Sequence, residues 1–282
     1  MTVEVICPLY NAEKYILDLN KNILKQKKVD ILNIKYILTE SKDRTEQILK
    51  ENNLNYELIK KESFSHSLVR ENAAFESKSD IVVFITQDIV IEKDNWLFEL
   101  VNPIFKGEAE ACFSRQLCKD NSIEKYTREK NYPNESRIVS KKDINELGLN
   151  TFFFSDASSA IKREVFVELN GYDNKDLPIS EDMYVAYKII QNGYRIKYCA
   201  KSEVVHYHNF SLKEQYDRYR LTGKFFKQNS YLDNYGTNKS GGGLAKYILK
   251  RAIEEKNIKV LLNFIPNMAA RFIGMKVGKY GK

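Results

Sequence analysis

Short apolar runs alternate with longer amphipathic segments along the first 114 residues. Apolar residues rich in β-branched side chains predict strands at residues 3–7, 34–38, 56–59, 81–85 and 109–114. Between them, apolar residues recur at helical spacing over residues 12–27, 43–51, 67–77 and 95–105. The run at 81–85 is apolar throughout, as in a strand buried on both faces. This β–α–β order predicts an α/β fold with a mostly parallel central sheet and helices on both faces.

The pattern is less regular in the second half. Residues 115–150 are polar and charged, and we expect an excursion over a site. We expect extended segments at 151–154 and 157–161, strands at 196–198 and 203–207, and helices at 164–170 and 181–192. A Tyr-rich amphipathic segment at 212–227, a Gly/Asn/Ser linker at 229–243 and two basic helices at 244–256 and 258–277 follow. The pattern therefore predicts a main domain at 1–210 and a helical extension at 211–282.

The net charge of +7 has an uneven distribution. Residues 239–282 carry ten basic and two acidic side chains, a net +8, which leaves −1 for the first 238 residues. Any anionic partner is therefore a partner of the extension. The extension has no recognisable nucleic-acid-binding motif and the rest of the chain is slightly acidic, so we expect no nucleic-acid partner.

Neither a signal peptide nor a membrane-spanning run is visible. Glu4 interrupts the first apolar stretch, and no run approaches the roughly 18 apolar residues of a spanning helix. The four cysteines form no CxxC pair or metal-finger spacing, which favours free thiols. We expect a cytoplasmic protein, either soluble or peripheral at the inner face of the cell membrane.

Ligands of an open parallel sheet bind beyond the carboxyl ends of its strands. The groups expected at this edge are Pro8, Tyr10, Asn11, Glu40, Gln87 and Asp88. No GxxxxGK[ST] or GxGxxG loop is present, so a diphosphate would be neutralised by a divalent cation and by basic side chains. Asp88, directly after the buried strand, is placed to bind a hard cation. Its alternative role is that of a turn or helix N-cap residue.

Six short motifs in order resemble those of an inverting family 2 glycosyltransferase with the GT-A fold. They are Cys7–Asn11, Thr39–Thr45, Phe64–Ser67 with Arg70–Asn72, Thr86–Asp88, Asn170–Asp173 with Glu181–Asp182, and His206–His208. The resemblance covers about residues 1–230. Three features resemble the bacterial rhamnosyltransferases, which transfer L-rhamnose from a dTDP-linked donor to surface polysaccharides. They are Gln87–Asp88 in place of a full Asp-x-Asp, the segment Phe64–His66, and the His206–His208 motif followed by a Tyr-rich helix and a basic tail. Two features depart from the family: Thr39–Ser41 lacks the usual Asp, and the Asp-x-Asp motif is reduced to Asp88.

The resemblance implies roles for individual residues. Asp182 would be the catalytic base and Glu181 its alternative; both could instead complement the dipole of a helix. Asp88 would bind a divalent cation, Mg²⁺ or Mn²⁺, with His206 or His208 as a further ligand, although the two histidines could simply pack. The residues expected to bind the nucleotide sugar are Pro8, Tyr10, Asn11, Glu40, His66, Arg70, Gln87 and Asp88. Those expected at the acceptor or donor sugar are Asp156, Ser158 and Ser159.

The remaining expectations concern partners. The leading hypothesis is transfer of rhamnose from dTDP-rhamnose to a polysaccharide or lipid-linked glycan. One alternative keeps the fold with a UDP-hexose donor; a different class would be a nucleic-acid-binding or non-catalytic sugar-binding protein. The segment 258–277 is apolar with mainly positive charges, which fits either a helix on an anionic membrane or a helix docked on the main domain. A homodimer through the Tyr-rich segment is a third use of the extension.

Overall fold

The structure, a computed structural model, describes residues 1–281, without the side chains of residues 237–241. Its eight described strands form one sheet in the order β3-β2-β1-β4-β7-β5-β8-β6. The strands are β1 (Thr2–Leu9), β2 (Asp30–Thr39), β3 (Tyr56–Ile59), β4 (Ile81–Ile85), β5 (Ala111–Leu117), β6 (Arg137–Val139), β7 (Ser158–Lys162) and β8 (Ile196–Val205). Strands β1 to β4 are parallel, as are β5 and β8, whereas β7 runs antiparallel between β4 and β5. The predicted mostly parallel sheet is confirmed.

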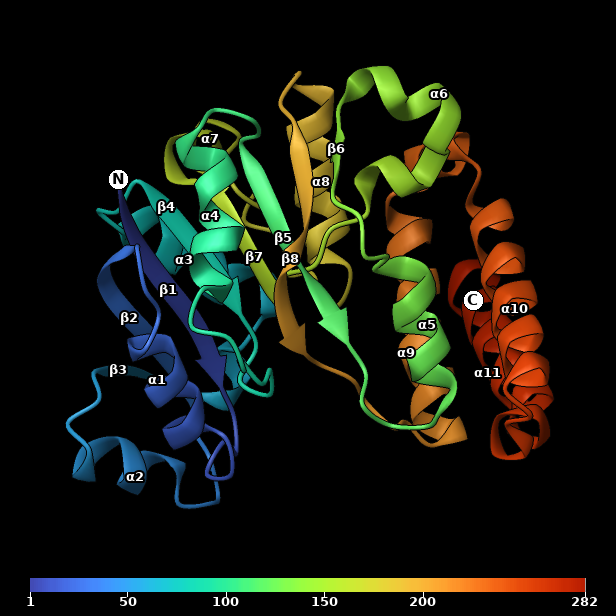
Figure 1. Ribbon diagram of the computed structural model, residues 1–282, viewed down its shortest axis with the longest axis horizontal. Helices are drawn as coiled ribbons and strands as arrows, with labels where there is room; N and C mark the ends of the chain where they lie inside the picture. Colours follow the sequence, from blue (N-terminus) through green and yellow to red (C-terminus); the bar gives the residue numbers. More distant parts are fainter. Residues whose placement is uncertain (282) are drawn as a thin grey trace.

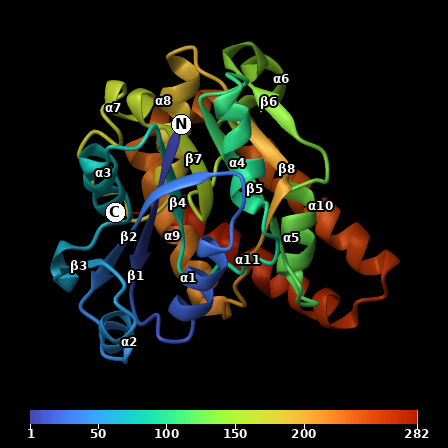
Figure 2. The same cartoon turned by 60° about the vertical axis from the view of Figure 1, so that its left-hand side comes forward.

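Helices cover both faces of the sheet, as the sequence predicts (Figures 1 and 2). One face is covered by α1 (Ile16–Leu24), α2 (Thr45–Glu51) and α4 (Trp96–Phe105), and the other by α3 (His66–Glu76), α7 (Arg163–Glu168) and α8 (Glu181–Gln191). Residues of β1 alternate between the two cores: Val5 and Cys7 pack on the first face, and Ile6 packs on the second. The continuous apolar run of β4 follows from this burial on both sides, because all five of its residues are buried.

The structure corrects several local predictions. Residues 115–150 contain α5 (Ile123–Asn131), β6, the 3₁₀ helix η2 (Lys141–Asp143) and α6 (Ile144–Leu147). The segment expected to be extended at 151–154 begins in the 3₁₀ helix η3 (Gly148–Phe152). The two strands expected at 196–198 and 203–207 are one strand, β8, whose pairing with β5 shifts between Ser114 and Arg115. The expected linker is the 3₁₀ helix η4 (Ser230–Tyr235) and the first turns of α10 (Thr237–Glu254).

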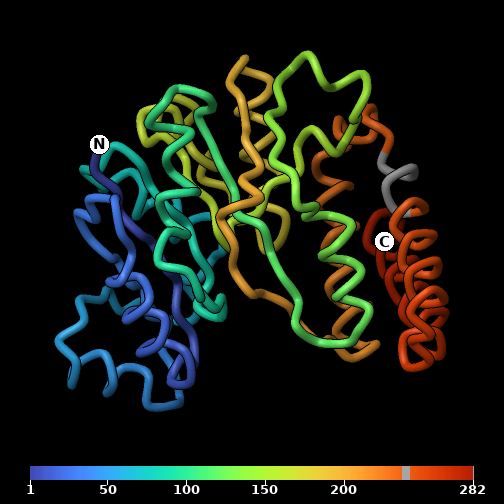
Figure 3. The backbone as a smooth tube through the Cα atoms, in the orientation of Figure 1, coloured from blue at the N-terminus to red at the C-terminus, as the bar shows by residue number. Residues whose placement is uncertain are grey.

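Three long helices end the chain: α9 (Leu212–Gln228), α10 and α11 (Ile258–Tyr280). Figure 3 traces them at the orange to red end of the backbone. Glycines bring α9 and α11 close together, since a Cβ on Gly274 would overlap the backbone carbonyl of Tyr216. The homodimer through α9 stays a prediction, as does the division at residue 210.

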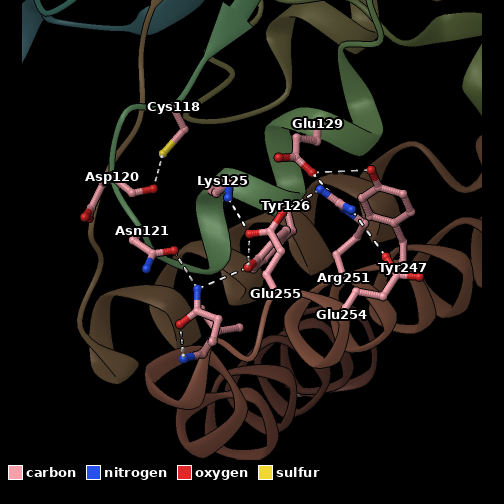
Figure 4. A network of polar contacts seen from close by, with 12 residues as sticks. Cys118, Asp120, Asn121, Lys125, Tyr126, Glu129, Tyr247, Arg251, Glu254 and Glu255 are labelled. Atoms are coloured by element: carbon pink, nitrogen blue, oxygen red, sulfur yellow. Dashed lines mark hydrogen bonds and ion pairs between the residues drawn. The ribbon is translucent and has the colours of Figure 1, made fainter.

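Helix α10 packs on α5, and this contact docks the extension on the rest of the chain (Figure 4). Lys125 forms a 2.5 Å ion pair with Glu255, and Arg251 forms ion pairs with Glu129 at 3.3 Å and with Glu255 at 2.6 Å. Beneath these charges, Tyr126 packs in an apolar cluster with residues of α10 and α11. One side of the extension is therefore fixed by specific contacts. No helix of the described residues is long and apolar enough to cross a membrane.

Candidate active site

The loops after β1, β2 and β4 meet at one edge of the sheet, where the arrowheads of the parallel strands point in Figure 1. The Gln87 side chain joins two of these loops: its Oε1 accepts from the Tyr10 N–H at 2.7 Å, and its Nε2 donates to the Tyr10 carbonyl at 2.9 Å. Asn11 joins the third, since its Oδ1 accepts from the Lys42 N–H at 3.0 Å. Gln87 and Asn11 therefore hold the edge together, and Tyr10 presents an exposed ring beside them.

The other nucleotide-binding candidates surround this edge at different depths. Pro8 lies within β1, paired with Ile37 of β2. Glu40 is exposed just beyond β2, and its carboxylate accepts a 3.4 Å bond from the Lys61 N–H. His66 begins α3, with its ring packed edge-on against Phe64 at 4.9 Å.

Asp88 and the two histidines form a compact cluster. Asp88 lies in the turn after β4 and faces His206 Nε2 at 3.6 Å and His208 Nε2 at 3.4 Å. Among the described residues, this is the one group of three His, Cys, Asp or Glu side chains whose ligand atoms could hold a metal ion. The helix-capping role considered for Asp88 is not seen, because α4 begins after Asn95. His206 and His208 follow the end of β8, and both face the carboxylate of Asp88.

The lowered pKa values of the two histidines make this cluster suitable for binding a cation. Burial lowers the pKa of His206 to about 3, and burial also lowers the pKa of His208. His206 Nδ1 lies 2.9 Å from Gln116 Oε1, an acceptor, so the assigned tautomer carries its proton on Nδ1. The Nε2 lone pair of His206 therefore faces a carboxylate oxygen of Asp88 with no proton between them. A cation satisfies both lone pairs, and the Gln116 contact is the kind of support that orients a metal-bound imidazole.

Asp182 and Glu181 begin α8, but their surroundings differ. Glu181 lies 3.4 Å from the guanidinium of Arg70, a side chain only 2% exposed. Burial raises the pKa of Asp182 well above its ordinary value, and the neighbouring charge of Glu181 adds to the shift. Asp182 Oδ1 accepts one bond, from the Met183 N–H at 2.7 Å. Glu181 is thus paired with a buried cation, whereas Asp182 has no such partner and a raised pKa.

The Asn170–Asp173 motif forms a turn fixed by α3. The Glu71 carboxylate accepts from the backbone N–H groups of Tyr172 and Asn174, the latter at 3.0 Å. Gly171 has a φ of 46°, and a Cβ there would come within 2.7 Å of Glu71 Oε2, so glycine satisfies both the backbone conformation and the contact. This turn positions the start of α8, and with it Asp182.

The structure separates the three residues expected near the sugar. Asp156 is buried and accepts 2.7 Å bonds from Ser159 Oγ and from the Tyr172 hydroxyl. Ser158 lies on the opposite face of β7, bonded to Trp96 Nε1 at 3.1 Å within a buried network. The alternation of side chains along a strand sends neighbours to opposite faces. Ser158 is thus part of the core, as Trp96 is, whereas Asp156 and Ser159 face the Arg70 side of the sheet.

Two arginines near the cluster were missed by sequence reasoning. The guanidinium of Arg218, on α9, lies 5.4 Å from the centre of the Phe210 ring, which stacks on His208 at 5.0 Å. Arg218 has no ion pair with a carboxylate of the described residues. Arg128, on α5, donates to the His206 carbonyl at 3.1 Å. No local motif marks them, because only packing brings α5 and α9 to this edge of the sheet.

Solved structures share this topology. The mannosyltransferase PcManGT of Pyrobaculum calidifontis, in complex with GDP-Man and Mn²⁺, aligns with a TM-score of 0.65 and 16% identity over 99% of this chain and 87% of that chain. TarS residues 1–349 of S. aureus, in complex with UDP-GlcNAc, align with a TM-score of 0.54 and 16% identity over 100% of this chain and 93% of that one. A longer TarS chain aligns at 0.55 and 20% identity over 81% of this chain and 40% of its own length. The fold is that of the GT-A glycosyltransferases.

Sequence comparison then assigns the family. The family model "Glycosyl transferase family 2" matches residues 4–169, and the chain belongs to this family. The O-antigen chain rhamnosyltransferase WbaN of Salmonella anatum is 33% identical in an alignment 249 residues long that covers 85% of this chain and 77% of that protein. The O-antigen chain rhamnosyltransferase RfbN of Salmonella typhimurium is 31% identical in an alignment 293 residues long, gaps included, that covers 99% of this chain and 90% of that protein. The chain is a glycosyltransferase with rhamnosyltransferase relatives.

Proposed function

We propose that the protein is a cation-dependent inverting rhamnosyltransferase, which transfers L-rhamnose from dTDP-L-rhamnose to a hydroxyl of a cell-surface polysaccharide or lipid-linked glycan. The observation that carries the proposal is that one chain has both a carboxylate–imidazole cluster and a carboxylate with a raised pKa, Asp182. This chain is also about one third identical to an O-antigen rhamnosyltransferase. The names of these relatives support rhamnose as the transferred sugar, and the resemblance of the motifs to dTDP-rhamnose-dependent enzymes supports the dTDP carrier. The alternative UDP-hexose donor stays in the donor screen below.

Asp88, His206 and His208 would hold the cation. Carboxylate oxygens suit Mg²⁺ and Mn²⁺, whereas imidazole suits the transition metals, so this mixed set favours Mn²⁺ over Mg²⁺. When bound, the cation would neutralise negative charge on the leaving diphosphate. The guanidinium of Arg218 and that of Arg128 lie near the cluster and would neutralise the rest. Tyr10 has an exposed ring on which the base would stack, with Lys61 Nζ 5.6 Å from the ring centre.

The proposed reaction is a single displacement at the anomeric carbon. Asp182 accepts the proton of the acceptor hydroxyl while the oxygen of that hydroxyl forms a bond to the anomeric carbon. The bond from the carbon to the diphosphate oxygen breaks, the diphosphate leaves with the electron pair, and the configuration inverts. Glu181 positions the site through its ion pair with Arg70. Asp156 and Ser159 would set the floor near the donor sugar, since both lie on the Arg70 side of β7.

The extension would place the enzyme at the inner face of the cell membrane. Helix α11 exposes Ile258, Leu262, Ile265 and Phe272, whose successive spacings of four, three and seven residues place them along one stripe. Lys256 and Lys259 lie beside it and have no carboxylate partner among the described residues. An apolar stripe flanked by cations suits the anionic cytoplasmic leaflet.

A donor and cation screen tests the proposed function. Binding and turnover of dTDP-L-rhamnose, a UDP-hexose and GDP-mannose would be measured with Mn²⁺, with Mg²⁺ and with EDTA. We expect dTDP-L-rhamnose to be preferred, Mn²⁺ to support turnover best and EDTA to abolish it. Asp88→Asn should weaken Mn²⁺ binding, whereas Asp80→Asn, at an exposed carboxylate near the amino terminus, should not. Equal turnover with EDTA would contradict the role of the cation, and preference for a UDP-hexose would contradict the donor.

A further inference from the structure

The C-terminal extension reaches the cation cluster through a chain of three charged side chains. Arg271, on α11, is buried, and its Nη2 donates to Glu124 Oε1 on α5 at 3.0 Å. The other carboxylate oxygen of Glu124 lies 3.9 Å from Nη2 of Arg128, one turn further along α5. Arg128 Nε in turn donates to the backbone carbonyl of His206 at 3.1 Å. A continuous path of polar contacts therefore joins the last helix of the chain to one of the proposed cation ligands.

The guanidinium of Arg271 is held in one orientation from several sides. Its Nε donates to Asn267 Oδ1 at 2.8 Å, and its Nη1 donates to the Tyr219 hydroxyl at 3.3 Å. The side chains of Arg271 and Glu124 are only 8% and 16% exposed. Ion pairs shielded from water are screened by salt far less than surface pairs are. Arg271 therefore provides a fixed positive charge that sets the direction of the Glu124 carboxylate.

The position of Glu124 decides what Arg128 binds. At 3.9 Å, the contact between Glu124 and Arg128 is longer than a hydrogen bond, whereas the 3.1 Å bond from Arg128 to the His206 carbonyl is fully formed. A carboxylate is a stronger acceptor for a guanidinium than a backbone carbonyl is. Without Arg271, we expect the Glu124 carboxylate to close on Arg128 and draw it away from His206. Arg271 thus keeps Glu124 from competing with the His206 carbonyl.

The backbone at His206 sets the direction of its imidazole. His206 is the first residue after β8, where its N–H donates to the Leu117 carbonyl at 3.0 Å and its carbonyl accepts from Arg128. These two bonds hold the peptide groups on both sides of the residue, and the ring then places Nε2 at 3.6 Å from Asp88. Loss of the Arg128 bond would leave one of the two peptide groups free to turn, and the ring with it.

We propose that Arg271 is a positioning residue for cation binding, which acts through Glu124 and Arg128 on the backbone of His206. The extension then contributes to the cation site although the three proposed ligands lie outside it. This inference rests on the proposed function, because it assigns the cation to the Asp88 cluster.

Arg271→Gln and Arg251→Gln are a matched pair of variants. Each removes a guanidinium that joins the extension to a glutamate of α5, but Arg251 pairs with Glu129, which has no part in the path to His206. Mn²⁺ would be titrated alone, with the free ion followed by electron paramagnetic resonance, so that the proposed contact of Arg128 with the diphosphate has no influence. We expect Arg271→Gln to weaken Mn²⁺ binding about tenfold, the lower end of the range for groups that orient a metal ligand. Arg251→Gln should bind Mn²⁺ as the wild type does.

A second mutation separates positioning from a general loosening of the extension. The double variant Glu124→Gln/Arg271→Gln should recover most of the lost Mn²⁺ affinity, because a neutral amide competes less for the Arg128 guanidinium. It also leaves no unpaired carboxylate at this buried position, so it should fold. Arg128→Leu removes the donor to His206 and should weaken Mn²⁺ binding as Arg271→Gln does. This variant tests the path even where Arg271→Gln fails to fold.

The histidine rings report the same change without metal. The chain has three histidines, His66, His206 and His208, so the ring ¹⁵N signals of the metal-free protein are few. We expect Arg271→Gln to shift the signals of His206 and to leave those of His66 unchanged. Arg251→Gln should shift neither. A shift confined to one side of the molecule indicates a turned ring rather than a loss of stability.

The outcomes distinguish this inference from the proposed function. Unchanged Mn²⁺ binding by Arg271→Gln or Arg128→Leu, or unchanged His206 signals in Arg271→Gln, would overturn the inference. Equal weakening by Arg251→Gln, or a double variant as weak as Arg271→Gln, would also overturn it, because either result would indicate a loosened extension. Failure of the wild type to bind Mn²⁺ would instead contradict the proposed cation, and the metal-free histidine signals would still test the path.

Discussion

Two adjacent carboxylates at the start of α8 have different chemistry because their neighbours differ. Glu181 lies 3.4 Å from the buried guanidinium of Arg70. Asp182 is half-buried, and its removal from water, together with the charges of Glu181 and Asp156, raises its pKa. A general base works best when its pKa approaches the operating pH, so the raised pKa of Asp182 supports its proposed role, while Glu181 is engaged by Arg70.

Removing the carboxylate of Asp182 should therefore abolish most of the turnover. We expect Asp182→Asn to lower kcat by about 10²–10⁴-fold, the usual contribution of a general base, with donor binding kept. Turnover by purified enzyme and calorimetric titration of the donor would measure the two effects. An unchanged kcat would remove Asp182 from the mechanism.

The raised pKa of Asp182 also predicts two pH dependences. Turnover needs the ionised base, so kcat/KM should rise with pH along a limb centred above the ordinary aspartate range. The folded state binds this proton more tightly than the unfolded state, so the stabilisation by the neutral form is lost as pH rises through the folded pKa. Asp182→Asn should then unfold at a higher temperature than the wild type at pH 8 and near the same temperature at pH 4. A parallel change at both pH values would contradict the shift.

Arg218 is a residue-scale prediction that follows from packing. Its guanidinium packs on the Phe210 ring, and that ring stacks on His208 of the cluster. The guanidinium has no carboxylate partner among the described residues. If it neutralises the leaving diphosphate, Arg218→Gln should lower kcat by about 10²–10³-fold, as does loss of one group that stabilises developing charge. Lys224→Gln, an exposed change on the same helix, is the control and should leave kcat unchanged. Equal effects of the two would indicate a general charge effect.

The sequence allowed us to predict the residues that directly follow strands. It was less informative for residues whose role depends on which face of the strand their side chain occupies. The edge groups Tyr10, Gln87 and Asp88 could be predicted because parallel strands end together. The prediction for Ser158 was wrong because Ser158 and Ser159 lie on opposite faces of β7. Which of the two faces the site depends on where β7 begins, and the sequence of a short strand does not determine that.

At the scale of elements, the helices and strands with clear periodicity were predicted, and those shaped by tertiary contacts were not. The expected linker at 229–243 is rich in Gly, Asn and Ser, yet it includes η4 and the start of α10. Packing of α10 against α5 and α11 supplies stability that the local sequence lacks.

The contact between α9 and α11 depends on glycines in the same way. A Cβ on Gly278 would overlap the backbone carbonyl of Arg220, and backbone has little room to move. Gly278→Ala should lower the free energy of unfolding by about 1–3 kcal/mol, the range for overpacking. Gly242→Ala, where the added Cβ meets open space, should instead raise it by about 0.5–1 kcal/mol. Chemical denaturation of both variants measures the difference, and a neutral Gly278→Ala would show that α11 does not pack as described.

At the scale of the whole molecule, charge and exposed apolar surface coincide on the extension. The first 238 residues carry −1 and residues 239–282 carry +8. The two acidic residues within 239–282, Glu254 and Glu255, are both engaged in ion pairs with Arg251. The surface that remains is a set of basic residues around the stripe of α11, whose Leu262 and Ile265 side chains are 74% and 75% exposed. The docked and membrane-bound roles considered for this segment are compatible, because α11 packs on α9 through one face and exposes the other.

The double variant Leu262→Ser/Ile265→Ser should accordingly lose most binding to vesicles that contain anionic lipid. Each buried apolar side chain is worth roughly 1.5–3 kcal/mol, so removing two should weaken partitioning by more than about tenfold. Leu24→Ser, which removes an exposed leucine on α1, should leave binding unchanged. Added salt should weaken binding of the wild type, since the basic residues act through screened charge. If the stripe instead joins two copies of the chain, the double variant would become monomeric in light scattering with unaltered vesicle binding, and the membrane role would be wrong.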